Sequence, residues 1–213
     1  MPVRRLSLRA ASYLRAHGLK GSLKRVWREG KNQLLHRRLV IFRADLVDGE
    51  FDDHPMPDRF HVDRYDAATE VPEGLIRRTS EYYSEELLRE NIDRRFGLGA
   101  ALWVLRSDAE DLGYFWTIAG RTMQPQYFFP LEARDVHLDD ALIFPPFRGR
   151  GLLPILTEEI LRFHKREGFR CAYMEAAEWN APMIKSVAKM GFTRIGLGRL
   201  KSRRGTYRVT WWR

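Results

Sequence analysis

Hydrophobic and polar positions along the chain follow two periods, and these predict strands and helices in turn. Short apolar runs bounded by turn residues predict buried strands, whereas apolar residues at helical spacing predict helices. The predicted strands cover residues 39–46, 101–105, 112–118, 134–144 and 170–176, followed by a strand starting at Phe192 and one at 206–212. The predicted helices run from an N-cap at Ser80 or Ser84 to Phe96, from Leu153 towards Gly168, and from Asn180 to a C-cap at Gly191. This order predicts an α/β fold, a central mixed sheet with helices on both faces.

Residues 48–80 have little periodicity and contain Pro55, Pro57 and Pro72. The pattern predicts irregular structure there. By contrast, the strands at 101–105 and 112–118 are joined by the polar turn 107–111, which predicts an antiparallel pair.

The junction after the 134–144 strand has the composition of an anion-binding turn. It runs Phe147-Arg148-Gly149-Arg150-Gly151-Leu152-Leu153-Pro154 and leads into a predicted helix. Glycines let the backbone approach a ligand, and the free N–H groups of the first helical turn favour an anion. The Walker pattern would need Lys-Ser/Thr here, and the dinucleotide fingerprint would need a third glycine. What remains is Arg-x-x-Gly-x-x, with Arg148 and Gly151 at its defined positions.

A second motif lies further along the chain. Asn180 follows the 170–176 strand, and Lys189-Met190-Gly191-Phe192 ends the next helix. Together the two motifs resemble the signatures of the GCN5-related N-acetyltransferase (GNAT) family, namely Gln/Arg-x-x-Gly-x-Gly/Ala and an Asn followed by a helix ending in Lys-x-Gly-Phe. The resemblance covers roughly residues 100–200. It implies the GNAT acyl-CoA N-acyltransferase fold and acetyl-CoA as co-substrate, without a metal.

The resemblance also implies which residues bind acetyl-CoA. The pyrophosphate is expected on Arg148, Gly149, Arg150, Gly151, Leu152 and Leu153. Backbone groups of Ala141 and Ile143 are expected to bind the pantetheine arm, with Asn180 nearby. On a regular strand these two residues share one face with Asp135, His137 and Asp139.

Some family members carry their general base nine or eleven residues before the signature arginine, which here are Asp139 and His137. Histidine titrates near neutral pH and suits this role, so His137 is the first candidate and Asp139 the second, with Asp135 as a further position. The competing interpretation is a polar surface at the end of a strand.

Two positions depart from the family pattern. Leu153 stands where Gly or Ala is usual, and Val187 stands where many members have a tyrosine that protonates the leaving thiolate. Either Ser186 or Tyr173 takes that role, or the thiolate leaves unassisted, or the protein no longer catalyses transfer.

The net charge of +9 is distributed unevenly. Residues 1–43 contain twelve Lys/Arg and one Asp/Glu, on segments with apolar stripes that include Leu6, Leu14 and Trp27. This divides the chain into a basic helical extension (1–38) and a GNAT domain (39–213). Such an extension either packs on the domain or contacts an anionic membrane, whereas nucleic acid is a weaker partner because no binding motif accompanies the charge.

Targeting and cysteine signals complete the sequence interpretation. The only cysteine, Cys171, excludes a disulfide framework and a cysteine-ligated zinc site, and its apolar strand predicts a core position. No apolar run reaches membrane-spanning length, and the N-terminus lacks an apolar signal core. We therefore expect a cytoplasmic protein with peripheral membrane contact as an open option.

The motifs together predict an acetyl-CoA-dependent N-acetyltransferase. Its acceptor is expected to be an amine of a small molecule or glycan intermediate, attacking directly with general-base assistance. Two alternatives stay open. One is a membrane-surface acyltransferase with a longer acyl donor or a lipid-linked acceptor, and the other is a non-catalytic CoA-binding protein of the same fold.

Overall fold

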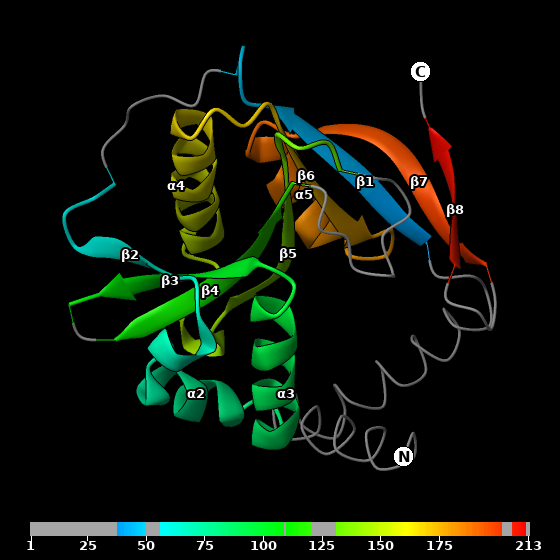
Figure 1. Cartoon of the computed structure of the whole chain (residues 1–213). Coiled ribbons are helices and arrows are strands. Elements are labelled where there is room, and N and C mark those ends of the chain that lie inside the picture. The colour runs from blue at the N-terminus through cyan, green and yellow to red at the C-terminus, as the bar shows by residue number, and fades with distance from the viewer. Residues whose placement is uncertain (1–37, 50–55, 109, 121–130, 202–205, 212–213) are drawn as a thin grey trace.

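The structure is a computed structural model, and it describes residues 38–49, 56–108, 110–120, 131–201 and 206–211. The predicted basic extension, apart from Arg38, lies outside the described residues. Within these ranges eight strands form one sheet in the order β2-β3-β4-β5-β6-β1-β7-β8 (Figure 1). The strands are β1 (Arg38–Asp45), β2 (Phe60–Tyr65), β3 (Ala100–Ser107), β4 (Asp111–Ala119), β5 (Asp135–Ile143), β6 (Cys171–Ala177), β7 (Thr193–Lys201) and β8 (Thr206–Trp211). β5 and β6 are parallel and the other neighbours antiparallel, which confirms the predicted mixed sheet.

Helices cover both faces of the sheet around β3 to β5. These helices are α2 (Glu73–Ser80), α3 (Glu85–Phe96), α4 (Leu152–Arg166) and α5 (Ala181–Lys189), with 3₁₀ turns η1 (Ala68–Glu70) and η2 (Pro145–Phe147). Figure 1 shows α4 on one face and α2 and α3 on the other. The inner side of α4 is fully buried at Leu156, Ile160 and Leu161, as its apolar spacing predicts. Ser84 and Asn180 are the N-caps of α3 and α5, which confirms the predicted helices. The C-cap of α5 is Met190, one residue before the predicted Gly191, which follows it with a left-handed φ of 81°.

The prediction of irregular structure for residues 48–80 is wrong from residue 60 onward. This part forms β2, η1 and α2. β2 is an edge strand that pairs with β3 alone, so its side chains are only partly buried and its apolar alternation is weak. α2 has eight residues and buries only Leu75, Ile76 and Thr79, too few for a clear helical period.

The expectation that five positions of β5 share one face is also wrong. Trp116 of β4 is opposite Asp139, and Tyr114, two residues away, is opposite Leu142, three residues further along β5. β5 therefore contains one extra residue, a β-bulge, and Asp140 there has a left-handed backbone with φ of 57°. Since one inserted residue reverses the alternation, Ile143, opposite Gly113, lies on the face opposite to that of His137 and Asp139.

Candidate active site

The parallel strands β5 and β6 separate partway along their length. They are paired from Asp135 and Cys171 as far as Leu138 and Met174, yet β5 continues to Ile143 and β6 to Ala177. The bulge at Asp140 lies at the start of this separation. Strand backbones need hydrogen-bonding partners, so a separation of two strands is a place where an extended ligand can pair with the protein. Ala141 and Ile143, the predicted pantetheine contacts, lie on this separated part of β5.

The glycine turn between η2 and α4 is shaped for an anion. Gly149 and Gly151 have φ of 79° and 75°, in the left-handed region that favours glycine, and α4 begins at Leu152. A Cβ atom built on either glycine meets no atom within 4 Å, so the space beside the turn is open. Left-handed residues in a turn direct successive N–H groups towards one point. The N-terminus of the 15-residue helix α4 lies at the same place, and the positive end of the helix dipole also favours an anion there.

Arginine side chains flank this turn. Arg148 Nε donates to the carbonyl oxygen of Ile143 at 3.0 Å, which fastens the turn to the end of β5. The guanidinium of Arg150 lies 5.6 Å from the ring centroid of Phe147, and both arginines are exposed. Leu152 is buried. Leu153, which stands where the family usually has Gly or Ala, packs against the core.

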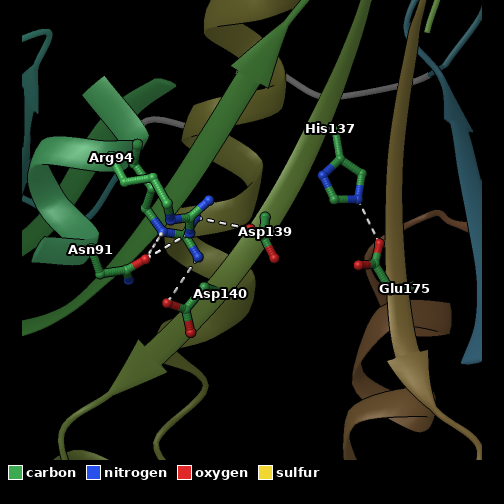
Figure 2. A network of polar contacts seen from close by, with 7 residues as sticks. Asn91, Arg94, His137, Asp139, Asp140 and Glu175 are labelled. Atoms are coloured by element: carbon green, nitrogen blue, oxygen red, sulfur yellow. Dashed lines mark hydrogen bonds and ion pairs between the residues drawn. The ribbon is translucent and has the colours of Figure 1, made fainter. Parts of the chain in front are cut away.

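His137 and Glu175 form a pair across the point where the strands separate. His137 Nε2 lies 2.5 Å from Glu175 Oε2. Figure 2 shows the two side chains facing each other from β5 and β6. His137 is 1% exposed, whereas the Glu175 side chain is 21% exposed, so the carboxylate is the member that solvent reaches. Burial lowers the pKa of His137, but the Glu175 carboxylate and, to a lesser extent, Asp139 raise it, and the net shift is upward. Glu175 directly follows Met174, the last β6 residue that pairs with β5.

Asp139 and Asp140 are held by one buried cation from α3. Arg95 Nη1 lies 2.8 Å from Asp139 Oδ2, and Arg95 Nη2 lies 3.2 Å from Asp140 Oδ2. Asn91 accepts hydrogen bonds from Arg95 and Arg94 (Figure 2). The Arg95 side chain is 6% exposed and also lies 5.1 Å from the ring centroid of Trp116. This network fastens the bulge of β5 to α3.

The candidate acids for the leaving thiolate differ in their surroundings. Val187 is fully buried in the core, so its side chain packs where many family members have the tyrosine. Ser186 is half-buried on α5. Tyr173 is opposite His137 in the paired half of the strands, and burial raises its pKa to about 12. A phenol with that pKa is a weak acid towards a thiolate, whose own pKa is about 8.5.

The remaining predicted residues have mainly structural contacts. Asn180 Oδ1 accepts a hydrogen bond from the Met183 N–H at 3.4 Å as the N-cap of α5. Cys171 is buried, as predicted, and its Sγ accepts from Arg43 Nε at 3.2 Å. Asp135 is buried and accepts from the Glu132 N–H.

Sequence reasoning missed Glu175 and Arg95. Glu175 lies within the apolar run Cys171-Ala172-Tyr173-Met174-Glu175-Ala176, and Arg95 lies near the end of a helix with many charges. A carboxylate inside a predicted buried strand could have identified Glu175 as a candidate site residue, because a buried charge needs a partner. Arg95 carried no such signal, since seven of the twelve residues of α3 are charged.

In the part of the chain that the structure describes, no helix is long and apolar enough to cross a bilayer. No cluster of three or more His, Cys, Asp or Glu side chains suited to a metal ion is found among the same residues.

Known proteins resemble this chain in sequence and in fold. The sequence model of the acetyltransferase (GNAT) family matches residues 69–192. No curated protein matches the sequence. A tandem GNAT protein from the clavulanic acid biosynthesis pathway has a similar solved structure, with a TM-score of 0.55 at 17% identity, over 83% of this chain and 53% of that chain. A GNAT-family acetyltransferase from Colwellia psychrerythraea gives a TM-score of 0.54 at 12% identity, over 74% and 53% of the two chains.

A third similar structure is the GCN5-related glucosamine N-acetyltransferase region of a fungal multi-domain GH3 β-N-acetylglucosaminidase. Its TM-score is 0.53 at 14% identity, over 84% of this chain and 22% of that chain. The chain thus spans about half the length, or less, of these three structures. At sequence identities of 12% to 17%, the structural similarity shows a shared fold and nothing further.

Proposed function

Because the chain belongs to the GNAT family of acetyltransferases, we propose that it transfers an acetyl group from acetyl-CoA to an amine of a small molecule or glycan intermediate. The observation that carries this proposal is the His137–Glu175 pair at the point where β5 and β6 separate. A proton acceptor and an opening for an extended ligand are thereby combined at one place.

The residues of the turn fit the CoA part of the donor. Gly149 and Gly151 leave open space at the start of α4, and the exposed Arg148 and Arg150 supply cations for a pyrophosphate. The separated backbone of Ala141 and Ile143 suits the amide groups of a pantetheine arm. Bound acetyl-CoA would supply the thioester carbonyl as electrophile and a thiolate as leaving group.

Glu175 is the residue that we assign to the acceptor amine. An amine is mainly protonated at neutral pH, so it must lose a proton before its nitrogen can form the new C–N bond. The partly exposed carboxylate of Glu175 can receive that proton, and buried His137 shares it and holds the carboxylate in place. Asp139 is less suited because Arg95 already neutralises it at 2.8 Å.

The leaving thiolate departs without a protein acid in this proposal. Val187 has no acidic proton, and Tyr173, with a pKa of about 12, is a weaker acid than the thiol that would form. The C–S bond therefore breaks to give a thiolate that takes its proton from solvent.

The proposal is tested by measuring free thiol release from acetyl-CoA with a panel of amino sugars, polyamines and amino acids. We expect release with at least one amine, and Glu175→Gln should lower kcat by ~10²-fold or more. Asp139→Asn is the comparison variant and should lose less activity. CoA should raise the melting temperature of all three proteins.

The pH profile gives a second test of the pair. Since Glu175 raises the pKa of His137, the base form of the pair should appear only above the usual histidine range, and kcat/KM should rise with pH through that value. Full activity of Glu175→Gln would refute the assignment of the base. CoA binding without thiol release for any amine or acyl donor would instead support the non-catalytic alternative.

A further inference from the structure

The two ends of the chain are basic and the middle is acidic. Residues 1–37 hold ten Lys/Arg and one Asp/Glu, and residues 191–213 hold seven Lys/Arg and no Asp/Glu. The intervening residues 38–190 carry twenty Lys/Arg and twenty-seven Asp/Glu. The net charge of +9 is therefore the sum of two basic ends and an acidic middle. CoA binding needs only the arginines near the turn and does not account for this distribution.

The sheet topology places the first described strand beside the strands of the basic C-terminal segment. β1 begins at Arg38, directly after the basic N-terminal segment, and lies between β6 and β7. β7 and β8 belong to the basic C-terminal segment and complete that end of the sheet. Figure 1 shows β1, β7 and β8 side by side, away from α2, α3 and α4. We call β1, β7 and β8 the basic edge.

Arginines occupy directly opposite positions across the three strands of the basic edge. Arg38 of β1 is opposite Arg199 of β7, and Arg199 is in turn opposite Arg208 of β8. Neighbouring strands are about 4.8 Å apart, and like charges at opposite positions destabilise a sheet. Arg199 and Arg194 are exposed, and the ion pair found in this row joins Arg38 to Glu178 at 3.5 Å. Such a row is unfavourable by itself and becomes favourable against an anionic surface.

We propose that the basic edge is a docking surface for an anionic phospholipid bilayer. Each base near an anionic leaflet contributes about 1 kcal/mol, so the arginines of the basic edge acting together are enough for reversible attachment. The aromatic residues Tyr207, Trp211 and Trp212 accompany the charges in the C-terminal segment, and tryptophan and tyrosine favour the membrane–water interface. This composition favours a bilayer over a polynucleotide. The proposal does not depend on the acetyltransferase reaction.

The test is co-sedimentation of the full-length protein with vesicles of 30 mol% phosphatidylserine in phosphatidylcholine, compared with pure phosphatidylcholine. We expect binding to the anionic vesicles only, weakened as salt rises from about 50 to 300 mM. Arg194→Glu/Arg199→Glu should reduce binding at least tenfold. Lys165→Glu/Arg166→Glu, an equal charge change at two exposed positions of α4, is the matched control and should reduce binding less than threefold.

The stability of the variants separates docking from folding. At position 199 a glutamate would stand between two arginine positions, so the melting temperature of the double variant should stay equal or rise while vesicle binding falls. Equal binding by the double variant and the Lys165→Glu/Arg166→Glu control would overturn the proposal. Absence of binding to anionic vesicles at low salt would also overturn it, as would tighter binding to duplex DNA than to vesicles.

Discussion

His164 gives the protein a stability that depends on pH. Its side chain is 4% exposed on α4, and its Nδ1–H donates to the carbonyl oxygen of Ile160 at 2.7 Å. The rings of Trp103, Phe163 and Phe169 surround it at centroid distances of 5.0 to 5.7 Å. Burial lowers the pKa of His164 from 6.5 to about 4; the hydrogen bond to Ile160 opposes this shift, and Arg64 adds to it. The folded protein therefore keeps this imidazole neutral at pH values where the unfolded chain protonates it.

The sign and size of the effect follow from that difference. Between pH 6.5 and 4 the unfolded state binds one more proton at this position than the folded state, so stability falls as the pH is lowered. A pKa of about 4 against 6.5 corresponds to about 3 kcal/mol of unfolding free energy at pH 4. His137 contributes in the opposite direction, because its pKa is raised: its contribution is present below pH 6.5 and disappears as the pH rises through its folded value.

Urea unfolding followed by tryptophan fluorescence at several pH values between 7 and 4 would measure this. His164→Gln keeps a hydrogen-bond donor and removes the titration, at the expense of some packing. The difference in unfolding free energy between wild type and variant cancels the titration of His137 and other distant groups. We expect wild type to lose about 3 kcal/mol relative to the variant between pH 7 and 4. A pH-independent difference would refute the reasoning.

Three further changes probe the turn and the bulge. Gly151→Asp should abolish the rise in melting temperature that CoA gives, because its carboxylate repels the phosphates, whereas the isosteric Gly151→Asn tolerates the same left-handed φ of 75° and should retain much of the shift. Arg95→Met should lower the unfolding free energy by about 3 kcal/mol in urea titrations, since it leaves Asp139 and Asp140 without their cation. Gly113→Ala should cost about 2 kcal/mol in the same assay, because its Cβ would overlap the Leu142 carbonyl oxygen and lie 2.7 Å from Ile143 Cδ1; Gly74→Ala, where a Cβ meets no atom within 4 Å, is its control.

Most helices and strands could be predicted from the sequence, because the spacing of their apolar residues matches the pattern of buried side chains. The 170–176 strand and the helix after Gly151 each have a continuous apolar signal, and both are confirmed. β2 and α2 were not predictable, since an edge strand and a short helix bury too few side chains to leave a period. The roles assigned to His137, Asp139 and the CoA-binding residues stay predictions, whereas the geometry adds Glu175 as the partly exposed partner of His137.

The bulge in β5 was beyond sequence reasoning for a different physical reason. Regular alternation through residues 135–143 is the default of any strand, and an extra residue becomes visible only when the partner strand fixes the register. Asp140 is among the residue types that tolerate a left-handed backbone, but that conformation is still unfavourable for it. Arg95 offsets this cost because one guanidinium bridges Asp139 and Asp140 across the bulge. The bulge therefore depends on Arg95 of α3, 45 residues earlier in the chain than Asp140. If Arg95 is what keeps the strands apart, Arg95→Met should weaken CoA binding as well as stability, although Arg95 lies on α3 and not in the glycine turn.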